Sequence, residues 1–197
     1  MVTLHGILMT VWMLLAVAQP LLVASGKKRL HMKLGQLGAV LAAAMVVAGY
    51  LTAIHATRVN PPDLKLFGLT PKEFLTVPLS GVVAFAGFVL AGISFRRRPE
   101  VHRPMMLMAS LSIVSAALGR MPALNGWYAG TSLEYWLSAF VSTLVLGALL
   151  LALKCALERR FDVWFAGAFG ALALVCVLAS VIARTPAWAQ LATALTR

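Results

Sequence analysis

The sequence predicts an all-α membrane protein, a single bundle of about six transmembrane helices. Of the 197 residues, 61% are hydrophobic and only 12% are charged, and the mean hydropathy is +0.89. This leaves too few polar side chains to cover the surface of a soluble domain of this length. The apolar residues are gathered into six runs, each long enough to cross a hydrocarbon core of about 30 Å. Most lysines and arginines lie in the turns between these runs.

The six runs define the expected transmembrane helices. They cover approximately residues 4–25, 33–56, 74–95, 104–122, 133–153 and 162–184. No basic residue precedes the first run, whereas a signal peptide carries its positive charge there, so we expect this run to be retained. Before the third run, Thr70-Pro71-Lys72-Glu73 reads as an N-cap, a first-turn proline and a capping-box glutamate. The fourth run opens with Pro104, which a first helical turn tolerates.

The basic residues are divided unequally between the two sets of turns. Eleven of the 17 lie in or beside the turns that follow runs one, three and five, which contain Lys27-Lys28-Arg29, Arg96-Arg97-Arg98 and Arg159-Arg160. Cytoplasmic turns carry the excess of lysine and arginine, so this set is expected to face the cytoplasm and both termini to face outward. The net charge of +11 therefore reports topology and contact with anionic lipids, not nucleic-acid binding.

One transmembrane domain over residues 1–197 follows from these spans. Residues 57–73 are expected to form an outer loop, and residues 185–197 an outer interfacial tail. Cys155 and Cys176 differ in expected depth by roughly 20 Å, so a disulfide between them is not expected.

The four histidines lie near the ends of predicted spans, and the topology sorts them into two pairs. His5 and His55 belong to the outer side, and His31 and His102 to the cytoplasmic side. Neutral imidazole is a common axial ligand of haem iron, and two imidazoles on different helices of a bundle can hold a haem between them. All four are therefore candidate ligands of haem b.

The spacing of the histidines restricts this hypothesis. His31 and His55 are 24 residues apart on one predicted helix, which corresponds to roughly 36 Å of rise. Rapid electron transfer between two haems at these levels would need an intermediate carrier. Two alternatives therefore remain open: a single haem, or two haems that exchange no electrons directly. At the cytoplasmic level, Lys33 and Arg103 are candidate partners of the haem propionates. The alternative to haem ligation is that these histidines are polar residues at the membrane interface and bind no ligand.

Other polar residues of the spans are expected to have structural roles. Arg120 and Glu134 are predicted to form an ion pair across the outer turn between runs four and five; the functional alternative is an anion or propionate site near the outer histidines. Gln19, inside the first span, is expected to bond Gln36 of the second. No serine-hydrolase set, phosphate loop or zinc-protease motif occurs, so catalytic residues stay unknown.

Two segments resemble a recurrent bacterial pattern. His31-Met32-Lys33-Leu34-Gly35 opens one helix, and His102-Arg103-Pro104-Met105-Met106, followed by Arg120, spans a later one. Over roughly residues 4–122 the chain resembles a group of uncharacterised small inner-membrane proteins with His-Arg-Arg-Leu-Gly and His-Arg-x-x-Met at these helix starts. Met32 and Lys33 replace the usual arginines, and Pro104 is a further departure. The resemblance implies the bacterial inner (plasma) membrane.

The layout is also similar to the ascorbate-linked transmembrane b-type cytochromes, which have six helices and two bis-histidine haems. Their histidines lie at different positions along the helices, so the likeness is architectural only.

Three functions remain open at this point. The first is a haem b protein that transfers electrons in the membrane, with a quinone or a protein as redox partner. The second is a non-catalytic assembly factor, partner subunit or small-molecule carrier without a cofactor. The third, a metal-dependent membrane enzyme, has the least support because no carboxylate lies in the middle of a span.

Overall fold

The computed structural model describes residues 2–197 as a helix bundle, without a β-strand in that range. Six helical segments are long and apolar enough to cross a membrane. These are Val2–Ala24, Lys28–Val59, Pro71–Ser94, Pro99–Leu118, Ser132–Glu158 and Val163–Ile182. The predicted all-α polytopic architecture is therefore confirmed.

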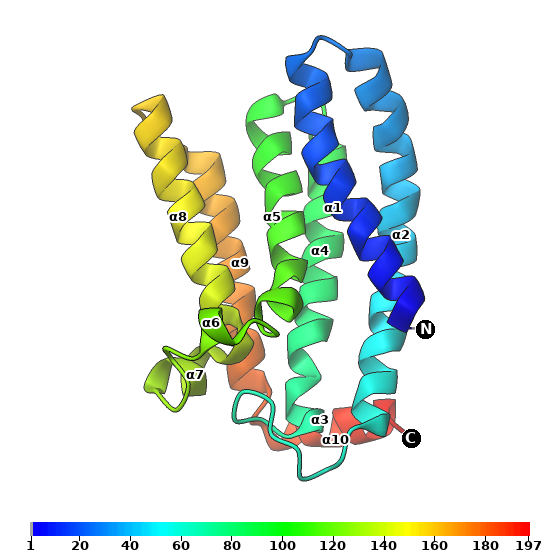
Figure 1. Cartoon of the computed structure of the whole chain (residues 1–197), viewed down its shortest axis with the longest axis vertical. Coiled ribbons are helices and arrows are strands. Elements are labelled where there is room, and N and C mark those ends of the chain that lie inside the picture. The colour runs from blue at the N-terminus through cyan, green and yellow to red at the C-terminus, as the bar shows by residue number, and fades with distance from the viewer. Residues whose placement is uncertain (1) are drawn as a thin grey trace.

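The first four spanning segments form a four-helix bundle. They are α1 (Val2–Ala24), α2 (Lys28–Val59), α3 with α4 (Pro71–Phe74 and Thr76–Ser94) and α5 (Pro99–Leu118). Helix α2 packs between α1 and α4, whereas α5 packs against α4 and, less extensively, α1. Helices α2 and α5 therefore lie on a diagonal of this bundle (Figure 1).

Trp12 of α1 occupies the centre of the four-helix bundle. Its indole Nε1 donates a hydrogen bond to the Ser110 hydroxyl of α5 at 3.1 Å, and its ring meets Phe85 of α4 edge to face at 4.8 Å between centroids. A buried indole N–H needs an acceptor, so Ser110 allows a large ring to fill the core without leaving an unsatisfied donor.

The third spanning segment begins as the sequence predicts. The Thr70 hydroxyl accepts from the Glu73 backbone N–H, and a Glu73 carboxylate oxygen accepts from the Thr70 backbone N–H at 2.7 Å. This reciprocal capping box satisfies two of the donors that a helix start leaves free.

A helical hairpin packs on the α4–α5 side of the bundle. It consists of α8 (Val141–Glu158) and α9 (Val163–Ile182). The fifth span is interrupted, since α7 (Ser132–Leu137) is separated from α8 by the 3-10 turn Ser138–Phe140, with Ser138 at φ 49°. A single helix was expected over 133–153. A short helix, α6 (Pro122–Asn125), precedes this break.

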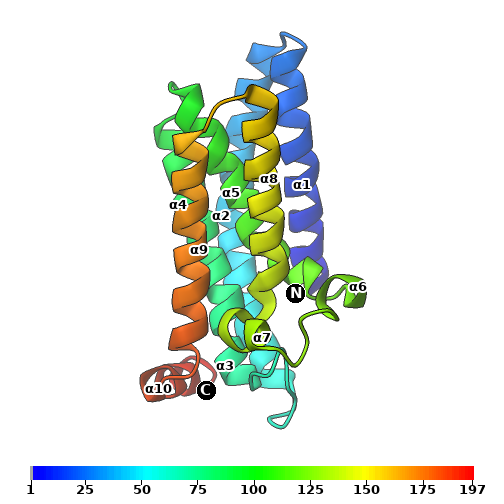
Figure 2. The same ribbon diagram turned by 90° about the vertical axis from the view of Figure 1, so that its left-hand side faces the viewer.

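The two ends of the molecule differ in charge and construction. The α1–α2, α4–α5 and α8–α9 turns, which contain the three basic clusters, lie at one end (Figures 1 and 2). At the opposite end, α10 (Pro186–Leu195) lies across the bundle. The Trp188 indole donates to the Lys72 carbonyl at 2.8 Å, and the Lys72 ammonium donates to the Thr193 hydroxyl at 3.0 Å. The predicted tail at 185–197 is thus a docked helix.

Candidate functional site

His31 and His102 lie together at the end of the bundle that contains the basic turns. Each is the fourth residue of its helix, since α2 starts at Lys28 and α5 at Pro99, and both helices start from that end. The two ring centroids are 6.4 Å apart with an interplanar angle of 89°. Both side chains are partly buried. The chain thus brings two imidazoles, 71 positions apart in sequence, into edge-to-face proximity across the bundle diagonal.

A hydrogen bond fixes the tautomer of His102. Its Nδ1 lies 2.8 Å from the Gly92 carbonyl oxygen of α4. A carbonyl can only accept, so Nδ1 must donate, and in the neutral ring Nε2 then carries a free lone pair. Histidines that ligate metals commonly donate their second ring N–H to a backbone carbonyl in this way.

Gln19 of α1 supplies the partner of His31. With its NH2 directed at the His31 ring, the amide donates to Nδ1 and to the His31 carbonyl, and its oxygen accepts from the Gly35 N–H at 3.1 Å. This orientation gives every amide atom a partner of the correct polarity. Because Nδ1 of His31 accepts, its Nε2 carries the proton in the neutral ring.

The histidine cluster therefore consists of one residue from each helix of the four-helix bundle. Its members are Gln19, His31, Gly92 and His102. The two rings are complementary tautomers, with a donating Nε2 on one and an accepting Nε2 on the other. Such a pair can ligate a metal ion through both Nε2 atoms once the rings turn towards one point, the Gln19 amide turns and the proton of His31 moves to Nδ1.

The spacing of the two rings fits axial ligation of one iron. Two metal–nitrogen bonds of about 2 Å each, plus the distance from each nitrogen to its ring centre, add to roughly 6 Å. The separation of 6.4 Å is close to this value. Neither of the two cavities described for the molecule is lined by His31 or His102. The separation of the ring centres and the donor chemistry match two axial imidazoles, whereas the edge-to-face orientation of the rings and the linings of the two cavities do not supply a ready haem site.

Two cations follow the paired histidines within two residues in the sequence. Lys33 and Arg103, the expected propionate partners, are both exposed, and neither has an acidic partner within 4.0 Å among the residues of the described range. Arg98 is engaged elsewhere, because it pairs with Glu100 at 3.1 Å and its guanidinium lies 5.5 Å from the centre of the Trp164 ring. The end of the bundle therefore offers unpaired positive charge to an anionic group.

The outer histidines are not brought together as the sequence predicted. The His5 ring faces the Gly49 segment of α2, where its Cε1 is 3.8 Å from the position that a Cβ on Gly49 would occupy. His55 is exposed and lies six residues further along α2, about 9 Å in rise. Helix α2 extends beyond the start of α1, so the two histidines occupy different levels (Figure 1). His5 instead buries an Nδ1 atom that has no hydrogen-bond partner in the described residues.

The expected ion pair between Arg120 and Glu134 is not formed, and this prediction is wrong. The Arg120 guanidinium donates to the Ala116 carbonyl at 2.6 Å, and the Glu134 carboxylate accepts from the Gly130 N–H at 2.6 Å. Each charged group is satisfied by the backbone of its own turn, which costs less side-chain entropy than bridging two turns.

Sequence reasoning missed Gln19 and Gly92 as members of the cluster. Gln19 was expected to bond Gln36, but Gln36 is exposed and Gln19 bonds His31. The usable signal was an amide inside an otherwise apolar span, which needs a polar partner at its own depth. No signal could have identified Gly92, because any residue offers a carbonyl.

No group of three or more metal-ligating side chains occurs in residues 2–197.

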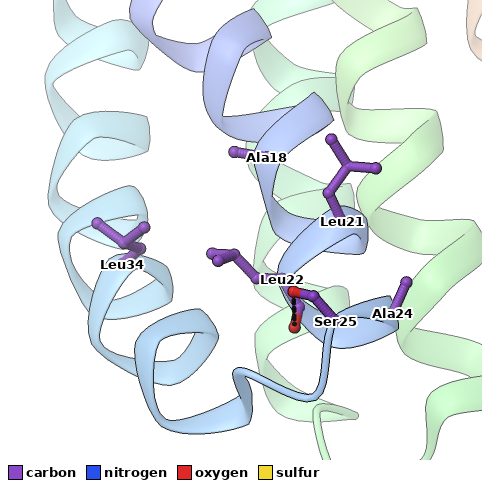
Figure 3. Close-up of a pocket in the computed structure, with 6 residues that line it drawn as sticks. All are labelled: Ala18, Leu21, Leu22, Ala24, Ser25 and Leu34. Carbon is purple, nitrogen blue, oxygen red and sulfur yellow. Dashed lines mark hydrogen bonds between the residues drawn. The ribbon is translucent and has the colours of Figure 1, made fainter.

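An open apolar groove lies along the last turns of α1 and is bounded on one side by Leu34 of α2 (Figure 3). Its volume is about 640 Å³. Its lining residues are Ala18, Leu21, Leu22, Ala24, Ser25 and Leu34. The groove begins next to Gln19 and ends at the basic α1–α2 turn.

Comparison with protein-family models, with curated proteins and with solved structures finds no match for the chain.

Proposed function

We propose that this integral membrane protein binds one haem b between His31 and His102 and transfers electrons at the membrane surface next to its basic turns. Haem supplies one-electron redox chemistry when bound. The protein is expected in a bacterial inner membrane, where a quinone or a protein redox partner exchanges the electrons. No second haem is proposed at His5 and His55, because His5 lies at the level of Gly49 and His55 is six residues further along α2.

The observation that carries this proposal is the ring pair itself. Two imidazoles 6.4 Å apart come from diagonally placed helices, and one of them is already oriented by a backbone carbonyl. Lys33 and Arg103 would neutralise the propionates from the solvent side, and they are free of acidic partners within the described residues.

The absorption spectrum of the purified protein tests the proposal. Protein from haem-supplied cells should show a Soret band that shifts on reduction with dithionite, at one haem per chain. His31→Ala and His102→Ala should each abolish the bis-histidine spectrum, and His55→Ala, an exposed outer histidine, should leave it unchanged. A colourless wild-type protein, or a spectrum that survives both inner variants, would refute the assignment.

A cofactor-free partner subunit or assembly factor is the second candidate. The specific observation in its favour is that Gln19, His31, Gly92 and His102 already bond one another in two pairs without a ligand. On this alternative the cluster only ties helix ends together. His31→Ala would then lower thermal stability in detergent, and no chromophore would be present in any variant.

A further inference from the structure

The groove between α1 and α2 ends at a cluster of cations that has no acidic counterpart. Lys27, Lys28 and Arg29 are exposed and lie between the lining residues Ser25 and Leu34 in the sequence. The ion pairs of residues 2–197 involve only Arg98, Lys154 and Arg160 among the basic side chains, so this triplet remains unneutralised. An open apolar groove next to uncompensated positive charge is complementary to an amphipathic anion.

The α1–α2 turn holds the cations close to the groove. Gly26, at φ 75°, closes the end of α1, and the backbone N–H of Lys27 bonds the Leu22 carbonyl at 2.8 Å. The chain therefore reverses within three residues. Figure 3 shows Leu22 directed towards Leu34 of α2 and Ser25 at the end next to this turn, with Leu21 and Ala24 on the other side of α1. The Ser25 hydroxyl donates to the Leu22 carbonyl at 3.2 Å, which leaves the groove surface apolar.

The dimensions suit part of one lipid chain. From Ala18 on α1 to Ser25 just after it, the groove runs along eight residues, a rise of about 10 Å. One leaflet of a hydrocarbon core contributes about 15 Å, so the groove covers the part of an acyl chain nearest the headgroup. Lipid tails are as apolar as leucine, and an apolar groove alone would not prefer one lipid over another. Selectivity must come from the basic triplet.

We propose that the α1–α2 hairpin binds one anionic phospholipid, with an acyl chain in the groove and the phosphate at Lys27, Lys28 and Arg29. The site includes none of the four residues of the histidine cluster, so it is independent of haem binding. Each lysine or arginine near the membrane surface strengthens anionic lipid binding, and three together give a preference of about tenfold or more over a zwitterionic lipid.

Native mass spectrometry of the full chain tests this site. The probes are phosphatidylglycerol and phosphatidylethanolamine with identical acyl chains. Wild-type protein should retain one phosphatidylglycerol per chain, and the triple variant Lys27→Gln, Lys28→Gln, Arg29→Gln should lose this retention about tenfold. The matched control is Arg96→Gln, Arg97→Gln, Arg159→Gln, which removes the same charge from other turns at the same end and should retain the lipid.

The groove has its own test. Ala18→Phe places a ring in the groove and should lower phosphatidylglycerol retention while the basic triplet stays intact. A phosphatidylglycerol with a photoreactive group in its acyl chain should label the Leu21–Leu34 region of wild-type protein, which needs no folded variant. The proposal would be overturned if both triple variants lost phosphatidylglycerol equally, or if wild-type protein retained the two lipids equally. It would also be overturned if the photoreactive lipid labelled another region, or if a second copy of the chain covered the groove in place of lipid.

Discussion

The Gln19 amide on α1 donates a hydrogen bond to Nδ1 of His31 on α2. The His102 ring has the opposite polarity at the same atom, because its Nδ1 donates to the Gly92 carbonyl at 2.8 Å. A side-chain amide can reverse by turning about its last bond, whereas a backbone carbonyl cannot. Gln19 is therefore the one adjustable partner of this ring pair, and it controls which nitrogen of His31 presents a lone pair.

Substitution of Gln19 should change haem affinity in a direction set by the new group. Gln19→Glu provides a carboxylate that accepts from Nδ1–H, which leaves the lone pair on Nε2, so haem should bind more tightly and its reduction potential should fall. Gln19→Leu removes the partner and should weaken haem binding about 10-fold or more. Haem titration and potentiometry measure both effects. Gln36→Leu, at an exposed amide of α2, is the control, and an equal effect there would contradict the role of Gln19.

Gly147 should tolerate no side chain. A Cβ at this position on α8 would meet the Phe169 ring, with Cδ2 at 2.8 Å, and Leu111 Cδ2 at 2.9 Å. The ring belongs to α9 and the leucine to α5, so a methyl group would push three helices apart. We expect Gly147→Ala to destabilise the protein by about 1–3 kcal/mol.

The matched control for this packing prediction is Gly170→Ala on α9. A Cβ there would have no neighbour within 4 Å. Thermal unfolding in one detergent compares the two variants. If the two alanine variants unfold at the same temperature, close approach of α8 to α5 and α9 is not what positions the hairpin.

Asp162 should make the α8–α9 turn sensitive to acid. Burial alone raises the pKa of its carboxyl group, but the Phe165 N–H bond at 2.9 Å and the Lys154 ammonium at 3.3 Å outweigh burial and lower the pKa below its ordinary value of 3.8. A lowered folded-state pKa means that the stabilisation is complete above pH 3.8 and is lost as the pH falls through the folded-state value.

Two substitutions separate the charge of Asp162 from its capping role. Asp162→Asn keeps a capping oxygen and should show a smaller loss of stability than wild type between neutral pH and acid. Asp162→Ala removes the cap as well and should cost about 1 kcal/mol at pH 7. The measurement is the unfolding temperature against pH. Parallel curves for wild type and the asparagine variant would show that this carboxylate does not carry the acid sensitivity.

The orientation of the bundle can be measured by cysteine accessibility. In a variant without Cys155 and Cys176, a cysteine at Gly26 should react only with a membrane-permeant thiol reagent in intact cells, because its turn is predicted to face the cytoplasm. A cysteine at Gly130 should react with an impermeant reagent. Both positions are turn glycines with φ 75° and 73°, so the two variants carry similar strain. The reverse labelling pattern would invert the topology.

Some features of the fold follow from local sequence. The capping box at Thr70 and Glu73 forms as predicted, because its partners are three residues apart and need no tertiary contact. The grouping of the basic turns at one end follows from the alternation of the spans. The break before α8 was not predictable, because Ser138 adopts φ 49° inside an apolar stretch without glycine or proline.

Hydrophobic run length by itself determined that this chain is a six-span bundle, because the bilayer thickness converts apolar length directly into membrane crossings. Counting turns also put His31 and His102 at the same end. Only the tertiary structure decided that these two rings meet while His5 and His55 do not, and that Arg120 and Glu134 satisfy their own turns. Such pairings depend on helix rotation, neighbour choice and relative length, which arise from packing between helices and leave no trace in the apolar pattern of any one of them.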